Sequence, residues 1–295
     1  MSRTATTHEQ REQHKQHKQH QHHEQHEKGT TDMTYQQPEP LAFSAGRLTG
    51  RVIFVTGASS GIGAAAVRRF AAEGALVAAA ARRADRVEAL AAELRAAGHE
   101  ALGLECDVTD ERSVADAVDR TVRAFGRLDG AFNNAGAGGA RARLHELDTD
   151  HFDTVMSTNV RGVFLSMKHQ IPAMLDSGGG SVVISSSVAG LVGSPLNTDY
   201  ATSKHALTGL VKCAALDYAR DNIRVNAIAP GPTRSEMFDR WMPTDEARAA
   251  LADRFPMNYV ADPDDMARAA LFLLSDESRW TTGTVLPCEG GFTAG

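Results

Sequence analysis

Short apolar segments alternate with amphipathic segments along most of the chain. The apolar segments are rich in Val, Ile, Leu and Ala, and the segments between them repeat apolar residues at helical spacing. In residues 85–97, for example, Val87, Leu90 and Leu94 share one helical face. Buried strands separated by helices predict a parallel sheet with helices on both faces. The predicted strands are residues 52–56, 75–81, 100–106, 128–133, 181–186, 224–229 and 284–287, and the predicted helices are 62–72, 85–97, 111–125, 149–175, 200–220 and 264–275.

The first 40 residues differ in composition from the rest of the chain. They are built mainly from Gln, His, Glu and Lys, and seven of the 12 histidines fall in this segment. Because such a segment has too few apolar residues to offset the entropy of ordering, we expect residues 1–40 to form a disordered tail and residues 41–295 a single folded domain. Metal binding by the histidines is an alternative interpretation, and a translation start at Met33 would remove most of the tail.

Composition excludes several functional classes. The formal net charge of −6 lacks the basic excess that nucleic-acid binding usually needs. Three widely spaced cysteines fit neither a disulfide framework nor a zinc site, and they favour a reducing, cytoplasmic compartment. No apolar run is long enough for a membrane helix. We therefore expect no nucleic-acid partner, no membrane partner and no metal.

A glycine-rich turn joins the first predicted strand to the first predicted helix. Gly57 permits a tight turn, Gly61 allows close approach of a pyrophosphate, and Gly63 allows close packing of helix on strand. The free N–H groups at the start of the helix favour phosphate. The turn therefore predicts a dinucleotide site with contacts from Gly57, Ser59, Ser60, Gly61, Ile62 and Gly63.

The end of the second predicted strand bears on which dinucleotide binds. A carboxylate there accepts hydrogen bonds from the ribose 2′-OH of NAD, whereas arginine suits the 2′-phosphate of NADP. This chain has Arg82 and Arg83 and no carboxylate at that point. The pair favours NADP(H) over NAD(H), and the alternative is that both arginines only begin a solvated helix.

A tyrosine and a lysine share one face of a predicted helix. Tyr200 and Lys204 are four residues apart, and Ser187 follows the fifth predicted strand. A free phenol has a pKa near 10, and a neighbouring ammonium favours its ionised form. The serine hydroxyl is placed to hold a substrate oxygen. Each signal is common by chance when taken alone.

Several short motifs follow one another along the chain: residues 56–63, Asp107 with Val108, residues 133–136, Asn159, Ser187, Tyr200 with Lys204, Pro230 with Gly231, and residues 289–292. With these motifs, residues 50–295 resemble the short-chain dehydrogenase/reductase family in its compact single-domain branch. The resemblance implies an α/β, Rossmann-type, doubly wound domain whose seven parallel strands have the order 3-2-1-4-5-6-7. It also implies a homo-oligomer, either a tetramer or a dimer, as a fold-level analogy.

The resemblance assigns roles to individual residues. Tyr200 would be the general acid/base, Lys204 would lower its pKa and bind the nicotinamide ribose, and Ser187 would orient the substrate. Asn159 would hold a water of a proton relay, and Asn133 would tie neighbouring strands together. Thr233 and Ser235 depart from the family's usual residues, although Ser235 keeps a hydroxyl. The remaining cofactor contacts would be Asp107 and Val108 for adenine, Asn134, Ala135 and Gly136 for the ribose and nicotinamide side, and Pro230, Gly231 and Thr233 for the carboxamide.

These observations predict an NAD(P)(H)-dependent oxidoreductase that interconverts a ketone or aldehyde and an alcohol. We expect substrate contacts from residues 137–147, 191–199 and 235–259, the last forming either an apolar lid or ordinary core packing. A non-catalytic dinucleotide-binding regulator is an alternative, as is a sugar-nucleotide isomerase or dehydratase, which usually has a longer C-terminal part. Within the enzyme class, a 3-oxoacyl-thioester reductase, a sugar dehydrogenase and a secondary-alcohol or steroid dehydrogenase remain open.

Overall fold

The computed structural model describes residues 46–295. The predicted disordered tail, with its seven histidines and Met33, lies outside the described residues. In the part described, no helix combines the length and apolarity needed to cross a membrane, and no three His, Cys, Asp or Glu side chains cluster as a metal site would require.

One seven-stranded sheet forms the centre of the described domain, in the order β3-β2-β1-β4-β5-β6-β7. Every neighbouring pair is parallel, so the predicted strand order is confirmed. The order reverses between β1 and β4, and parallel sheets of this kind bind ligands in the crevice beyond the carboxyl ends of the strands at such a point. The strands are β1 Val52–Thr56, β2 Leu76–Ala81, β3 Ala101–Glu105, β4 Gly130–Asn133, β5 Gly180–Ser185, β6 Ile223–Pro230 and β7 Val285–Cys288.

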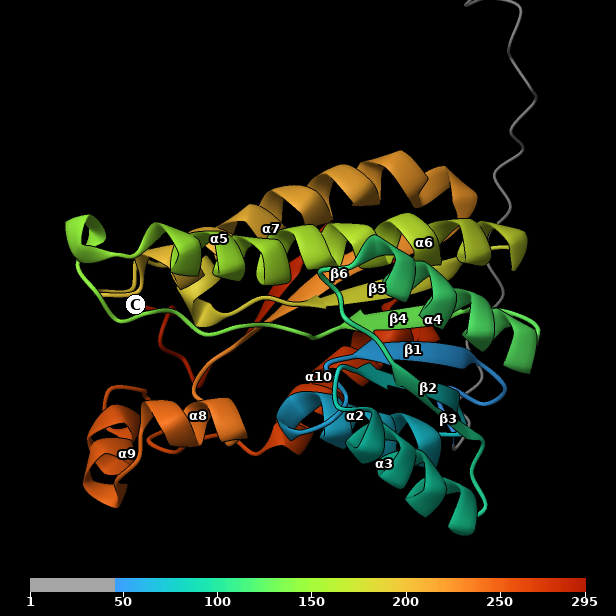
Figure 1. Cartoon of the computed structure of the whole chain (residues 1–295), viewed down its shortest axis with the longest axis horizontal. Coiled ribbons are helices and arrows are strands. Elements are labelled where there is room, and N and C mark those ends of the chain that lie inside the picture. Colours follow the sequence, from blue (N-terminus) through green and yellow to red (C-terminus); the bar gives the residue numbers. More distant parts are fainter. Residues whose placement is uncertain (1–45) are drawn as a thin grey trace, which may run out of the picture. The chain divides into compact units, whose positions relative to one another are not determined.

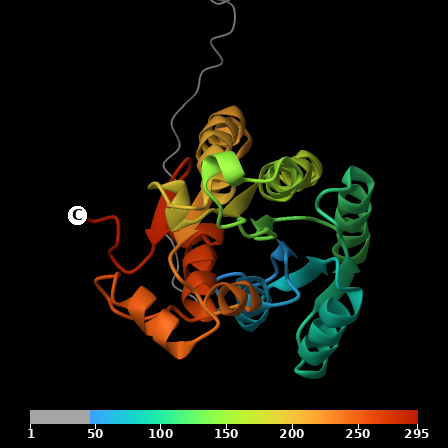
Figure 2. The same cartoon turned by 60° about the vertical axis from the view of Figure 1, so that its left-hand side comes forward.

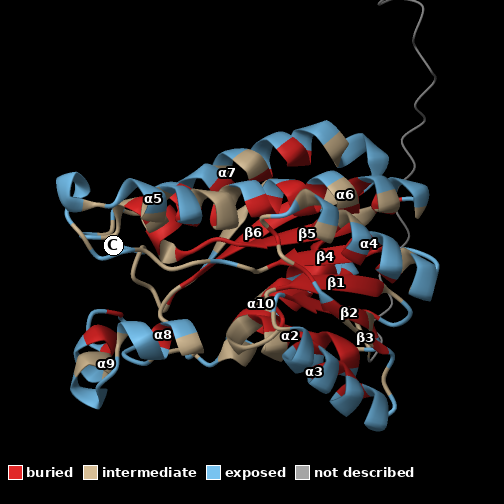
Figure 3. Cartoon of the chain, viewed as in Figure 1, coloured by how far each residue is buried: buried red, intermediate tan, exposed pale blue. Residues whose placement is uncertain are grey.

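Helices cover both faces of the sheet (Figures 1 and 2). One layer packs Phe70 and Leu271 against the sheet, and the other packs Ile171 and Leu207. The five inner strands are buried on both faces, the two edge strands are partly exposed, and the outer faces of the helices are exposed (Figure 3). The doubly wound arrangement is therefore confirmed. The first layer consists of α2 Gly61–Ala72, α3 Ala84–Ala96 and α10 Pro263–Leu274, and the second of α4 Glu111–Phe125, α6 Gly162–Asp176 and α7 Thr198–Tyr218.

The long helix predicted over residues 149–175 contains a wider turn. Helix α5 Thr149–Met156 passes through a π-helical turn, Ser157–Arg161, into α6. Single π turns of this kind occur often at functional sites. The turn contains Asn159, whose side chain is fully buried. The sequence shows helical periodicity on both sides of this turn but gives no sign of the local widening.

Residues 235–259, called the cap below, contain two short helices that were not among the predicted elements. They include α8 Glu236–Trp241 and α9 Asp245–Ala252. Both helices lie to one side of the sheet layers in Figure 1. Phe238, Leu251 and Phe255 form a small apolar cluster there, separate from the two main clusters. The cap therefore has its own small core, as the packing alternative requires.

Candidate active site

A cleft of about 890 Å³ opens at the carboxyl ends of the strands. It is lined by the β1–α2 turn, the ends of β2 to β6, the start of α7 and the cap. All the predicted site residues line this cleft except Gly63 and Asn159, which lie behind its wall. The fold therefore brings together residues that are up to 176 positions apart, from Gly57 to Thr233.

The β1–α2 turn has the geometry of a phosphate site. Gly57 and Gly61 adopt φ values of +67° and +53°, which favour glycine. A Cβ at Gly63 would lie 2.2 Å from the Gly57 carbonyl oxygen, so a side chain there would force the backbone apart. Ser60 precedes α2 without capping it, and the first turn has no acidic residue. The N–H groups at this helix start are therefore available to a pyrophosphate.

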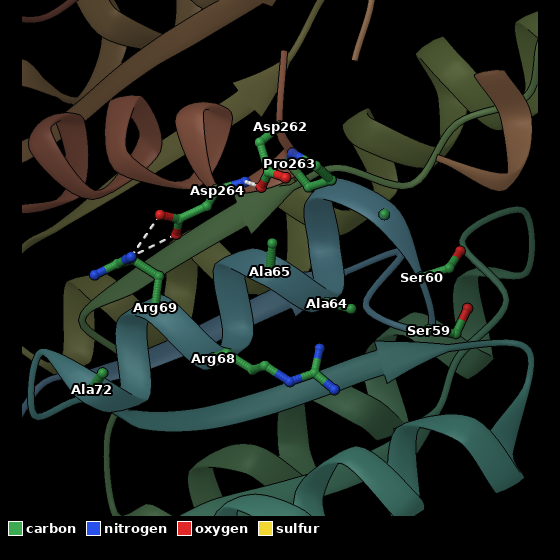
Figure 4. A pocket seen from close by; sticks show the side chains of 11 residues that line it. Ser59, Ser60, Ala64, Ala65, Arg68, Arg69, Ala72, Asp262, Pro263 and Asp264 are labelled. Carbon is green, nitrogen blue, oxygen red and sulfur yellow. Dashed lines mark hydrogen bonds and ion pairs between the residues drawn. The ribbon is translucent and has the colours of Figure 1, made fainter. Parts of the chain in front are cut away.

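A second hollow of about 700 Å³ lies against the outer side of α2 (Figure 4). Arg69 reaches Asp264 at the start of α10 through two hydrogen bonds of 2.8 and 2.6 Å, drawn in the figure. Arg68, also in its wall, pairs with Glu93 at 2.8 Å. The Arg69–Asp264 pair joins α2 to α10. Because the arginines of this hollow are paired within the protein and it contains no predicted catalytic residue, it is a weaker candidate for the site.

Arginines cluster at the end of the cleft next to β2. Arg83 donates to the Ser59 hydroxyl at 3.0 and 2.8 Å and to the Ser60 hydroxyl at 2.8 Å. Its remaining nitrogen, Nη1, pairs with Glu236 of the cap at 2.7 Å, and the same carboxylate also pairs with Arg86. Within residues 46–295, Arg82 is exposed and makes no ion pair or hydrogen bond with a side chain. Sequence reasoning missed Glu236, because nothing in its local sequence indicates partners 150 or more positions away.

Lys204 is held at the bottom of the cleft. Only 4% of the residue is exposed, its Nζ donates to the Ser185 carbonyl oxygen at 2.8 Å, and Nζ lies 5.5 Å from the centre of the Tyr200 ring. Burial lowers the pKa of Lys204 to about 8. The helical spacing thus brings the two side chains together as predicted.

Tyr200 is partly buried and lines the cleft together with Ser187. Burial raises the pKa of Tyr200, and a hydrogen bond with the Ser187 side chain opposes this rise. The direction is opposite to the lowering expected from Lys204, because loss of hydration dominates. The neutral phenol is the form that donates a proton, so the site as it stands suits a general acid at neutral pH.

Asn159 ties the wall of the cleft to α7. Its Oδ1 accepts from the Ala137 N–H at 2.7 Å, and its Nδ2 donates to the Ala137 carbonyl at 3.0 Å and to the Ser203 hydroxyl at 2.9 Å. The Ser203 hydroxyl in turn donates to the Tyr200 carbonyl at 2.7 Å. The amide therefore links the segment after β4 to the helix turn that carries Tyr200 and Lys204.

Asp199 is a further polar residue of the site. It is 1% exposed, and its carboxylate accepts from the N–H groups of Tyr200 at 2.7 Å and Ala140 at 3.0 Å. His151 Nε2 lies 3.3 Å from the same carboxylate. Asp199 thus joins the start of α7 to the loop after β4. The available signal was an acidic residue in the first turn of the helix, immediately before Tyr200.

The Asn133 side chain has a partner other than the predicted one. Asn133 pairs with Gln170 of α6 through two hydrogen bonds of 2.9 and 3.0 Å, so its side chain joins β4 to a helix and not to neighbouring strands.

The Ser235 hydroxyl accepts from the Phe238 N–H at 3.1 Å and so caps α8. The Thr233 hydroxyl donates to the Gly231 carbonyl at 3.1 Å. Asp107, at the end of β3, accepts from the N–H and the hydroxyl of Thr109 at 2.9 and 2.8 Å.

Several known proteins are similar to this chain in sequence or in fold. The model of a family described as enoyl-(acyl carrier protein) reductase matches residues 57–293. The chain is 47% identical to an A-factor type gamma-butyrolactone 1′-reductase (1S-forming) of Streptomyces virginiae, over 84% of this chain and 97% of that protein. It is 43% identical to a 2,5-dichloro-2,5-cyclohexadiene-1,4-diol dehydrogenase of Sphingobium indicum, over 84% and 98%. The crystal structure of levodione reductase matches with a TM-score of 0.80 and 36% identity, covering 84% of this chain and 99% of that chain.

Proposed function

The chain belongs to the short-chain dehydrogenase/reductase family, and from this premise we propose that it is an NADP(H)-dependent enzyme that interconverts a ketone and a secondary alcohol on or beside a small ring. Membership makes the chain an oxidoreductase of alcohol and carbonyl substrates at the level of class. The observation that carries the finer proposal is that one cleft joins Ser187, Tyr200 and Lys204 to the uncapped start of α2.

The residues of the cleft fit a nicotinamide dinucleotide. The N–H groups from Gly61 onward would hold the pyrophosphate, Arg82 with Arg83 the 2′-phosphate, and Asp107 with Val108 the adenine. Asn134, Ala135 and Gly136 would border the ribose and nicotinamide side, and Pro230, Gly231 and Thr233 the carboxamide. The bound cofactor would supply or accept a hydride, which no side chain of this chain can do.

The protein's own contribution is binding, orientation and one proton. Ser187 and Tyr200 would both donate hydrogen bonds to the substrate oxygen, and Tyr200 Oη would pass its proton to that oxygen during reduction. The Lys204 ammonium, held by Ser185, would stabilise the phenolate left behind. In the oxidising direction the same groups would act in reverse.

The cap supports a mainly apolar, ring-sized substrate. Met237, Phe238, Trp241 and Phe255 line the cleft next to the catalytic residues. The relatives' names include a cyclohexadiene diol dehydrogenase and a cis-4-hydroxycyclohexanecarboxylate dehydrogenase. We therefore place a cyclic ketone ahead of a 3-oxoacyl thioester or a sugar.

We also propose a cytoplasmic homo-oligomer. Phe164 on α6 and Leu216 on α7 are 51% and 82% exposed, as expected if a second copy of the chain covers these helices. The cysteines of the described domain are all unpaired, which favours a reducing compartment. Light scattering of the purified protein should give a dimeric or tetrameric mass, and a monomeric mass would contradict this part of the proposal.

A substrate panel tests the function. Nicotinamide absorbance is followed with NADPH and NADH in parallel, against cyclic ketones, a 3-oxoacyl thioester, an enoyl thioester and a keto sugar. We expect the fastest turnover with a cyclic ketone and NADPH. Preference for NADH would contradict the role of Arg82, and a preference for the enoyl thioester would favour carbon–carbon double-bond reduction. Cofactor binding without turnover on any substrate would favour a non-catalytic regulator.

A further inference from the structure

Glu236 connects the cap to the arginines at the adenosine end of the cleft. We propose that Glu236 adjusts the preference between NADP(H) and NAD(H) by competing with the 2′-phosphate of NADP(H) for Arg83 and Arg86. This inference rests on the proposed use of NADP(H). It assigns a role to a residue of the cap, outside the turn and the strand end that carry the dinucleotide motif.

The contacts of Glu236 support competition for the same groups. One carboxylate oxygen pairs with Arg83 Nη1 at 2.7 Å, and the other pairs with Arg86 Nη1. The carboxylate therefore bridges two guanidinium groups, as a phosphate can. Glu236 and Arg83 also line the cleft itself, so a ligand entering there meets this ion pair. The guanidinium groups hold the pKa of Glu236 below its usual range, so it is charged at neutral pH.

The local charge balance leaves room for a further anion. Arg83 and Arg86 share the Glu236 carboxylate, and Arg82, which also lines the cleft, has no ion-pair partner in residues 46–295, so the three arginines outnumber the two carboxylates of Glu236 and Asp107 there. The Glu236 side chain is 41% exposed, so it can move into water when a phosphate takes its place. Exposed pairs of this kind are weak. The competition is therefore an adjustment of affinity and does not block the site.

The same short helix carries the substrate end of the cleft. Glu236 is the first residue of α8, and Met237, Phe238 and Trp241 of that helix line the cleft. Release of Glu236 by a 2′-phosphate would free one attachment of α8 while substrate contacts are being made. NAD(H), which lacks this phosphate, would leave the attachment intact.

Ligand affinity separates the competition from the chemistry. Adenosine 2′,5′-bisphosphate and AMP differ only in the 2′-phosphate, and both are titrated calorimetrically into the full chain. We expect Glu236→Gln to lower the Kd for the bisphosphate about two- to fivefold and to leave the Kd for AMP unchanged. Asp239→Asn is the matched control, because it removes the same charge from the same helix but its partner is Arg248. It should change neither Kd.

Two outcomes would overturn the inference. An unchanged bisphosphate affinity in Glu236→Gln would mean that the ion pair does not compete, and a weakened affinity would mean that Glu236 positions the arginines for the phosphate. The wild-type protein tests the proposed cofactor separately, by its ratio of bisphosphate to AMP affinity. If the wild type shows no preference but Glu236→Gln gains one, the competition stands and the NADP(H) preference fails. If the wild type prefers the bisphosphate and the variant gains nothing, only the competition fails.

Tryptophan fluorescence tests the release of α8. The chain has two tryptophans, Trp241 on α8 and Trp280, which is 93% exposed, so Trp280→Phe leaves Trp241 as the reporter. The bisphosphate should shift the emission of Trp241 and AMP should not. In the Glu236→Gln background, the emission should already be shifted before any ligand is added. Identical responses to both ligands would contradict release of the helix.

Discussion

The catalytic end of the cleft and the cap are held in place by different kinds of interaction. Asn159, Ser187 and Lys204 are nearly inaccessible to solvent, and hydrogen bonds of 2.7 to 3.0 Å, buried or partly buried, join Asn159 and Lys204 to the main chain. The cap has one small apolar cluster, and its ion pairs are exposed, including those of Glu236 and Arg248. Exposed ion pairs contribute roughly 0 to 1 kcal/mol each, whereas breaking a buried polar contact costs about 1 to 3 kcal/mol. The proposed catalytic residues are therefore held by the core, whereas the proposed substrate contacts lie on a weakly attached segment.

Tyr200→Phe should have the largest effect, because it removes the proton donor while keeping the ring. We expect kcat to fall about 10²- to 10⁴-fold with the fold and the nucleotide affinity retained. Tyr218→Phe is the matched control, since Tyr218 lies at the far end of the same helix and does not line the cleft. Turnover by Tyr200→Phe within threefold of the Tyr218→Phe rate would remove Tyr200 from the chemistry.

Gly63→Ala should come next, because it disturbs the rigid end through the backbone. The new methyl group would lie 2.2 Å from the Gly57 carbonyl oxygen and 2.8 Å from Asn134 Nδ2. Overpacking of this kind costs about 1 to 3 kcal/mol, so both the melting temperature and the dinucleotide affinity should fall. Gly209→Ala, on α7 with no atom within 4 Å of the new methyl group, should be neutral or stabilising. Equal melting temperatures for the two variants would show that the turn is not tightly packed.

The pH profile should show a smaller effect at the same end of the cleft. Burial lowers the pKa of Lys204 to about 8, so its charge is present below that pH and lost above it. We expect kcat/KM for ketone reduction to decline above about pH 8. Unfolded Lys204 keeps its proton up to a pKa near 10.4, so the free-energy cost of burying its charge diminishes as the pH rises between the two values. The free energy of unfolding therefore rises over this range, and the decline in rate is not unfolding. A rate that stays flat up to the pKa of a free lysine would contradict the role of this ammonium.

Trp241→Ala should have the smallest effect, because it alters the weakly held cap. Trp241 is partly exposed, packs edge-on against Phe238 and lines the cleft. We expect KM for a cyclic ketone to rise about three- to tenfold with kcat little changed, and stability to change by under about 1 kcal/mol. Trp280→Ala, outside the cleft, should leave KM unchanged. A large fall in kcat for Trp241→Ala would show that the cap takes part in the chemistry. It would contradict the assignment of the chemistry to the other end of the cleft.

The sheet and the catalytic end of the cleft were also more predictable from sequence than the cap. Apolar periodicity located the strands within about two residues, because buried strands and short turns leave a local signal, and the resemblance gave their order. The same local spacing brought Tyr200 beside Lys204. The two cap helices were not among the predicted helices, since they are short and mostly exposed.

Contacts between distant segments were the part that sequence reasoning could not supply. Glu236 meets Arg83 across 153 positions, and Asp199 meets Ala140 across 59. Neither pairing follows from periodicity or composition, because each depends on how loops converge at the carboxyl ends of the strands. The pKa direction of Tyr200 was missed for a related reason, since burial in the cleft depends on the tertiary structure.

Isotope transfer tests the central claim most directly. The full chain is incubated with a cyclic ketone and NADPH that carries deuterium at the transferring position of the nicotinamide, and the alcohol product is analysed by mass spectrometry. The account predicts that the wild-type protein places one deuterium on the carbinol carbon and that Tyr200→Phe forms little product. Alcohol that contains no deuterium, whichever face of the nicotinamide carries the label, would contradict hydride transfer. Alcohol that Tyr200→Phe forms and labels as fast as the wild-type protein does would contradict assistance by Tyr200.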